Sequence, residues 1–383
     1  MEKLPLNGIR VLDLSRLLPG PYLTQLLVDL GAEVIKVETP VIGDYSRLIP
    51  PEMDLHGLFE SVNRGKKSLA INYRNKRGRE LLLELVKTAD VILEGFRPGR
   101  MNKLGLGYEV MKEIKSQIIY CSLSGFGQSG PYRDRAGHDP TYLALGGALS
   151  LNSRQGEKPV PYGLPVADLS GAMLAAIAIL AALVAVRSSS QGMYLDMALL
   201  DGVISWMTPL ALSTLLTGNN VQAGTHPLLG GLATFNNLYE TADGKYLILG
   251  ALEPTLWSEF CKVMNRPDWL PRQFDRTLGE ELSGAIISKT EKEWLSAFAE
   301  SDGCLEGVNS VADLLSQPQV IARGYIRMEN GKPVSIESPF VFARRELSAP
   351  PRLGQHTRQI LEELNVSDSE LDTLKSSKVI ALD

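Results

Sequence analysis

Cysteine and histidine are scarce in this sequence of 383 residues. The three cysteines (Cys121, Cys261 and Cys304) are odd in number, widely separated and in no paired motif. This pattern argues against disulfides and a zinc site, and it favours a reducing compartment. Only four histidines occur, so a histidine placed among polar, turn-forming residues is a notable candidate for chemistry.

The sequence also lacks a basic excess and a long apolar run. Its net charge is -5, with 44% hydrophobic and 22% charged residues, which is typical of a soluble globular protein and not of one that coats nucleic acid. Residues 1–8 show no secretory signal, so we expect a cytoplasmic protein. The most apolar segment, residues 172–186, is shorter than the roughly 20 residues that span a bilayer. We therefore expect no membrane span and a buried, alanine-rich helix.

The first half of the chain alternates between short apolar runs and helical patterns. The predicted strands are residues 9–14, 33–37, 68–71, 91–93, 118–123 and 193–197. Strands separated by helices indicate a parallel sheet with crossover helices, and thus the α/β class.

The second half predicts a smaller α+β domain. Residues 238–249 fit a hairpin around Asp243 and Gly244, and helical patterns follow from 254 to about 315. At this length two lobes are expected. We assign residues 1–195 to a large domain, 196–230 to linker helices, 231–320 to the small domain and 321–383 to a C-terminal segment that returns to the large domain.

A cationic stretch opposes the overall negative charge. Residues 63–77 contain no acidic residue and six cations, which are Arg64, Lys66, Lys67, Arg74, Lys76 and Arg77. These residues follow the second strand, near an edge of the sheet where ligands bind, which favours a phosphate clamp extended by Arg97, Arg100 and Lys103. A solvated surface patch is the equally open alternative.

Residues 125–130 match the dinucleotide fingerprint G-x-G-x-x-G after a predicted strand. The fingerprint requires a helix that begins at its end, and residues 131–135 have no helical period. We interpret the motif as a glycine-rich loop, and we expect neither NAD nor a metal as cofactor.

Three residues are candidates for proton transfer: His138, Asp168 and Glu253. Each also has an ordinary interpretation, as a loop histidine, as an N-cap of the apolar helix and as a helix-start residue, respectively. If Asp168 is functional, the helix N-terminus is expected to keep it ionised. Proton exchange beside a thioester couples the three: two groups serve opposite faces of the carbon, and Glu253 orients the imidazole of His138.

The sequence resembles the class III CoA-transferase superfamily (the CaiB/BaiF type), and within it the α-methylacyl-CoA racemases. Matching segments are spread over nearly the whole chain: residues 8–15, 19–21, 30–38, 63–68, 97–99, 124–127 and 353–357. The resemblance implies an interlocked homodimer with a Rossmann-like large domain. It also implies an acyl-CoA substrate whose CoA is held by cations, for which we choose Arg64, Lys67, Arg74, Arg97 and Lys103.

The resemblance leaves two activities open. His138 and Glu253 match the racemase pattern, which implies 1,1-proton transfer on a 2-methylacyl-CoA through an enolate. Asp168 matches the aspartate of both racemases and transferases, so a CoA transferase with an acyl-aspartyl anhydride at Asp168 is the alternative. Transferases tend to carry a longer glycine-rich loop than residues 228–232 provide. A CoA-ester binding protein without activity is a third hypothesis.

Overall fold

The computed structural model describes residues 3–49, 57–226, 231 and 233–383. These residues form two compact units. The first comprises Met1–Gly146, Gly163–Trp206 and Glu337–Asp383, and the second comprises Gly147–Tyr162 and Met207–Ile336. The chain therefore passes between the units four times. Residues 321–383, expected as one C-terminal segment, are divided between them at Glu337.

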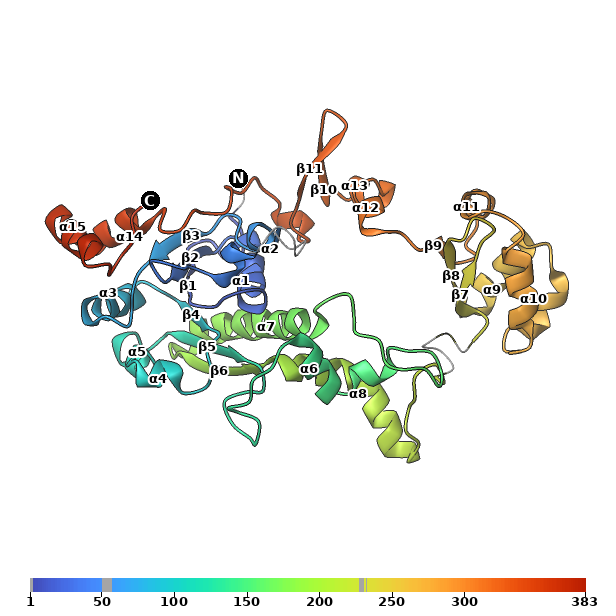
Figure 1. The fold of residues 1–383 in the computed structure, drawn as a ribbon, viewed down its shortest axis with the longest axis horizontal. Coiled ribbons are helices and arrows are strands. Elements are labelled where there is room, and N and C mark those ends of the chain that lie inside the picture. Colours follow the sequence, from blue (N-terminus) through green and yellow to red (C-terminus); the bar gives the residue numbers. More distant parts are fainter. Residues whose placement is uncertain (1–2, 50–56, 227–230, 232) are drawn as a thin grey trace. The chain divides into compact units, whose positions relative to one another are not determined.

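A six-stranded parallel sheet is the centre of the first unit (Figure 1). Its order is β3-β2-β1-β4-β5-β6, with strands β1 (Arg10–Asp13), β2 (Glu33–Glu38), β3 (Lys67–Ala70), β4 (Val91–Glu94), β5 (Ile119–Ser124) and β6 (Met193–Ala198). All six strands expected from the sequence form, and the α/β class is confirmed. The strand order reverses between β1 and β4, and in sheets of this order ligands bind beyond the carboxyl ends of the strands at that point.

Helices connect and cover these strands. They are α1 (Pro19–Asp29), α2 (Gly57–Ser61), α3 (Lys76–Val86), α4 (Arg100–Lys103), α5 (Tyr108–Ile114), α6 (Asp139–Leu145), α7 (Val166–Ser189), α14 (Thr357–Glu362) and α15 (Asp368–Ser376). Short 3-10 helices lie at Tyr45–Leu48 and Val341–Ala343. Helix α8 (Leu199–Thr217) begins in this unit and continues into the second.

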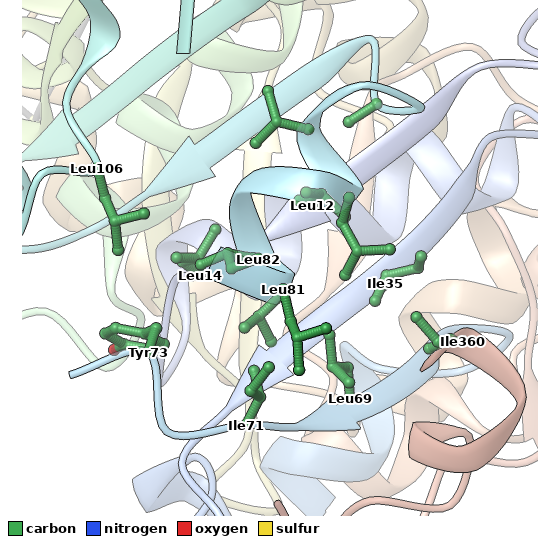
Figure 2. Packing of buried hydrophobic residues seen from close by; sticks show 14 of the residues in the cluster. Leu12, Leu14, Ile35, Leu69, Ile71, Tyr73, Leu81, Leu82, Leu106 and Ile360 are labelled. Carbon is green, nitrogen blue, oxygen red and sulfur yellow. The ribbon is translucent and has the colours of Figure 1, made fainter. Parts of the chain in front are cut away.

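The buried core of the first unit joins residues from both ends of the chain. Leu81 and Leu82 of α3 pack with Leu12 and Ile35 of the sheet, and Ile360 of α14 belongs to the same cluster (Figure 2). Ile380 forms a bridge to Ile71 beside β3. The C-terminal residues thus complete the hydrophobic layer over the first strands.

The second unit is an antiparallel sheet with helices. Its strands are β7 (Asn236–Glu240), β8 (Tyr246–Gly250) and β9 (Leu305–Gly307), and its helices are α9 (Pro254–Val263), α10 (Leu278–Ile286), α11 (Glu291–Phe298), α12 (Val311–Leu314) and α13 (Pro318–Ala322). It also holds 3-10 helices at Ala148–Leu151 and Pro267–Arg272 and a hairpin of β10 (Ile326–Glu329) and β11 (Lys332–Ile336). The hairpin predicted around Gly244 is confirmed as β7 and β8. Strand β9 was not predicted, because three residues are too short to show a period.

Helix α7 is longer than expected. It has 24 residues. Both α7 and α8 are long and apolar enough, by length and composition, to cross a membrane. The prediction from the fifteen most apolar residues underestimated this helix, whose first turn contains Ala167 and Asp168. In the first unit, however, α7 packs against α1, β5 and β6, as a core helix of an α/β layer does.

Candidate active site

A cavity of about 790 Å³ opens in the first unit, where the strand order reverses. Its wall consists of residues that follow β1, β4 and β5, together with the loop before α6 and the start of α7. Among them are Ser15, Arg16, Leu17, Arg97, Arg100, Lys103, Gly125, Arg133, Asp134, Arg135, His138, Tyr142 and Asp168. The location agrees with the rule for ligand sites in open α/β sheets.

Buried charges hold the loop after β1 in place. The carboxylate of Asp13 accepts the backbone N–H of Ser15 (2.9 Å), and the ammonium of Lys36 donates to the carbonyl of Ser15 (3.3 Å). Leu17 has a φ of 63°, a left-handed conformation that costs a residue with a side chain about 1 kcal/mol or more. Asp44, which pairs with Lys36 at 2.7 Å, accepts the N–H of Leu17 at 3.0 Å. The loop is thus preorganised beside the cavity.

This loop presents Arg16 to the cavity. The guanidinium of Arg16 lies over the rings of Phe96 (4.9 Å) and Tyr45 (5.2 Å), and it donates to the hydroxyl of Tyr73 (3.4 Å). Among the described residues Arg16 has no carboxylate within ion-pair distance. The sequence interpretation missed Arg16, although its position just after the first strand was an available signal.

His138 is exposed, lines the cavity and is the N-cap of α6. The hydroxyl of Thr141 accepts the backbone N–H of His138 at 3.0 Å and donates to its carbonyl at 2.7 Å. Pro140 follows in the first turn and favours the helical start. The backbone of His138 is therefore held in place at the cavity wall.

Asp168 lies in the first turn of α7 and lines the same cavity. Its ordinary interpretation as the N-cap of this helix is wrong, because the helix begins at Val166 and Pro165 is the N-cap. The cap comes from another helix: Oδ1 of Asp139 accepts the N–H groups of Ala167 (2.7 Å) and Asp168 (3.0 Å). One carboxylate therefore connects the starts of α6 and α7.

The expectation that the helix end keeps Asp168 ionised is wrong. Burial, and secondarily the negative charge of Asp139, raise the pKa of Asp168 to about 7. The main physical reason is burial, which disfavours the charged form of the carboxyl, and the nearby charge of Asp139, which accepts the N–H groups of this turn, adds to it. At neutral pH Asp168 can therefore both take and release a proton.

Tyr142 was not singled out from the sequence, yet it is buried in the cavity wall. It lies in α6, four residues after the N-cap His138. Burial and the charges of Asp168 and Asp139 raise its pKa to about 12, so its hydroxyl stays a donor. Gly125 and Gly137 make room for the ring, because a Cβ on either would lie within 2.5 Å of a Tyr142 atom.

The cavity is strongly basic. Arg97, Arg100 and Lys103 are exposed in its wall, and in the described part of the chain none of the three forms an ion pair. Arg133 is partly engaged, since it donates to the carbonyl of Gln128 (2.9 Å) and pairs with Asp134 (3.3 Å). Unpaired cations at this place can hold phosphate groups.

The cationic stretch after the second strand does not line this cavity. Lys67 pairs with Glu33 at 2.6 Å, Arg74 is exposed, and Arg64 is half-buried with its charge acting on Asp29. Lys66 is fully buried and donates to Asp13, Thr24 and Asn63. Arg77 pairs with Glu370 at 2.8 Å. Much of this stretch therefore serves the fold.

Glu253 belongs to the second unit, where it is exposed and is the N-cap of α9. Its carbonyl accepts the N–H of Trp257 at 3.0 Å. The structure brings His138 and Asp168 into one cavity of the first unit. Of the glycine-containing segment 228–232, all but Gly231 lies outside the described residues.

Comparisons with known proteins cover the chain almost completely. The family model CoA-transferase family III matches residues 6–357. The chain is 35% identical to the succinyl-CoA:glutarate CoA-transferase of Mus musculus (98% of this chain, 90% of that protein). It is 33% identical to the alpha-methylacyl-CoA racemase of Homo sapiens (98% and 97%). A CAIB/BAIF family protein of Brucella suis has a similar structure, with a TM-score of 0.81, 31% identity and coverage of 95% and 100%. The chain therefore belongs to CoA-transferase family III.

Proposed function

We propose that this enzyme interconverts the two epimers of a 2-methylacyl-CoA thioester by 1,1-proton transfer. The observation that carries the proposal is the pair of His138 and Asp168 in one basic cavity. An imidazole and a carboxyl are two different proton carriers, as a reaction with a base on one face and an acid on the other requires.

The proton balance of the reaction is simple. One of the two groups removes the proton from C2, which leaves an enolate, and the other returns a proton to the opposite face. Asp168 suits either part, because its pKa of about 7 lies near the working pH. The hydroxyl of Tyr142 supplies a hydrogen-bond donor for the enolate oxygen.

We propose that Arg97 and Lys103, with Arg100, hold the phosphates of CoA. Their exposed positions in the cavity wall and their lack of ion pairs in the described part of the chain support this role. For Arg64, Lys67 and Arg74 a contact with CoA stays a prediction, as does the role of Glu253 in orienting the imidazole of His138. We infer no metal or redox cofactor, since proton transfer needs neither.

The test is deuterium exchange at C2. Incubation of the protein with each epimer of a 2-methylacyl-CoA panel in D₂O is expected to give uptake at C2 together with epimerisation. In His138→Ala, proton removal from one epimer is expected to slow by about 10²-fold or more, and removal from the other is expected to slow less.

His356→Gln is the matched control. His356 lies in the same unit, outside the cavity wall, where its Nδ1 accepts the N–H of Ser68 at 3.1 Å. We expect wild-type exchange from this variant. Absence of exchange from every branched thioester would reject the racemase, and equal slowing of both epimers in His138→Ala would reject the assignment of faces.

A CoA transferase is the second candidate, favoured by the similarity to succinyl-CoA:glutarate CoA-transferase. Here the carboxylate of Asp168 attacks the thioester carbonyl, the carbon–sulfur bond breaks, and CoA leaves as the thiolate before it is passed to a second acid. Hydroxylamine or borohydride trapping of an adduct at Asp168 supports this activity. An acyl-CoA panel that leaves no adduct counts against it.

We also propose a cytoplasmic, interlocked homodimer. Several large apolar side chains of α8 are exposed in the single chain, among them Trp206 (55%), Leu215 (79%) and Leu216 (76%). Apolar side chains gathered on one helix are typical of surfaces that a partner covers. The exposed free thiol of Cys304 suits a reducing compartment.

A further inference from the structure

Asp139 connects the backbones of the two proposed proton carriers. It follows His138 in the chain, and its carboxylate accepts the backbone N–H of Asp168 across 29 residues of sequence. Asp139 is 9% exposed, and both of its described side-chain hydrogen bonds are accepted ones, as befits an ionised carboxylate. A buried negative charge therefore lies next to Asp168 without belonging to the reacting pair.

The first contribution of Asp139 is positional. Pro165 precedes α7 and has no side-chain acceptor, so the N–H groups of Ala167 and Asp168 need a cap from elsewhere. Asp139 Oδ1 accepts both, at 2.7 and 3.0 Å. Because Asp139 is itself the first residue of α6, the start of α7 is held against the helix that begins after His138.

The second contribution is electrostatic. Two carboxylates at close range cannot both ionise freely, so a charge on Asp139 favours the protonated form of Asp168. Helix α7 packs against α1, α6, β5 and β6, which carry the ionisable residues Tyr22, Asp29, Tyr120, Cys121, Asp139, Tyr142, Tyr194 and Asp196. Of these, Asp139 is the one whose charge acts on Asp168. The cavity wall adds His138, Arg16, Arg97, Arg100, Lys103, Arg133, Asp134 and Arg135.

We propose that Asp139 is a positioning residue that fixes Asp168 at the start of α7 and, through its charge, adds to the burial that favours a proton on the Asp168 carboxyl. The inference rests on the proposed function for its use in catalysis, since a protonated Asp168 is the acid that returns a proton to the enolate. The effect on Asp168 itself exists whether the enzyme is a racemase or a transferase.

The test separates the cap from the charge. Asp139→Asn keeps a side-chain oxygen for the two N–H groups and removes the charge, whereas Asp139→Ala removes both. The carboxyl of Asp168 is followed by ¹³C NMR in protein labelled at aspartate, with its signal assigned by loss in Asp168→Asn. In Asp139→Asn we expect the proton affinity of Asp168 to fall about tenfold, and the pH profile of C2 exchange to move to lower pH by the same amount.

Asp196→Asn is the matched control, because Asp196 also accepts a backbone N–H, that of Gln128 at 3.0 Å, and has no effect on Asp168. An Asp168 titration unchanged in Asp139→Asn, or a wild-type Asp168 that titrates near pH 4, would overturn the proposal. A wild-type titration near pH 4 would overturn the proposal even if a variant fails to fold. A shifted titration without C2 exchange from any thioester would reject the racemase and leave the role of Asp139 standing.

Discussion

At the scale of single residues, Asp168 lowers the stability of the fold at neutral pH. Its pKa is raised from 3.8 to about 7. Between about pH 4 and pH 7 the folded state therefore binds more protons than the unfolded state. Stability is therefore lost as pH rises from about 4 to 7, and the loss stays constant above 7. Such a cost is common for a group whose position serves chemistry.

Asp168→Asn is accordingly expected to stabilise the protein. The amide carries no charge, so at pH 8 the free energy of unfolding should rise by up to about 4 kcal/mol, and the gain should vanish near pH 4. Urea denaturation at several pH values measures both. Asp134→Asn, at an exposed position of the same cavity, should change the free energy by less than about 0.5 kcal/mol. A gain that is independent of pH would show that the buried charge of Asp168 is not its cause.

The cations of the cavity wall are expected to contribute more to the binding of CoA than an exposed cation outside it. Arg97→Ala or Lys103→Ala removes a charge from the cavity wall and should weaken binding of CoA by about 10- to 100-fold, since hydrogen bonds to charged groups contribute roughly 1.5–3 kcal/mol. Arg74→Ala is the comparison, because Arg74 is exposed outside the wall. Calorimetry at two salt concentrations provides the measurement. An equal loss of CoA affinity in all three variants would favour a CoA site that includes the cationic stretch of residues 63–77.

At the scale of elements, the loop after β1 depends on charges buried beneath it. Lys36 and Asp44 are both fully buried and form an ion pair at 2.7 Å. Asp13, also buried, has a lowered pKa: burial alone would raise it, but the charges of Lys36 and Lys66, together with hydrogen bonds from Ser15 and Thr24, outweigh burial. Removing one partner of such a pair leaves an uncompensated charge, which costs more than removing both.

Asp44→Ala should therefore lower the free energy of unfolding by about 3 kcal/mol or more, and it should release the N–H of Leu17 at the edge of the cavity. The double variant Asp44→Ala with Lys36→Met is expected to recover part of the loss. Urea denaturation of the four members of this cycle measures the coupling. Additive losses would show that the pair is not a unit.

At the scale of the whole molecule, the apolar surface of α8 predicts a dimer. Sedimentation equilibrium should give twice the chain mass of 41.9 kDa with no dissociation on dilution, because interlocked chains separate only by unfolding. Leu215→Glu with Leu216→Glu, at two exposed positions of α8, should reduce the yield of folded protein if a partner covers them. A stable monomer of the wild-type protein would contradict the proposed assembly.

Local sequence patterns were sufficient for the first unit's sheet. Each strand is a short apolar run between a turn and a helix, so its neighbours in sequence reveal it. The same local reasoning identified residues 125–130 as a loop: no helix begins between Gly125 and His138, and α6 starts only at Asp139. It failed for β9, which is too short, and for the start of α7, where Pro165 and Val166 precede the most apolar residues.

The amino-acid sequence by itself determined the parallel α/β sheet and the family, and it singled out His138 and Asp168, because these depend on residue types and their order. Only the tertiary structure decided which cations line the cavity, that Asp139 caps α7, and that Asp168 titrates near neutral pH. Ion pairing and desolvation depend on distances through space between residues far apart in the chain. No pattern of near neighbours in the sequence contains that information.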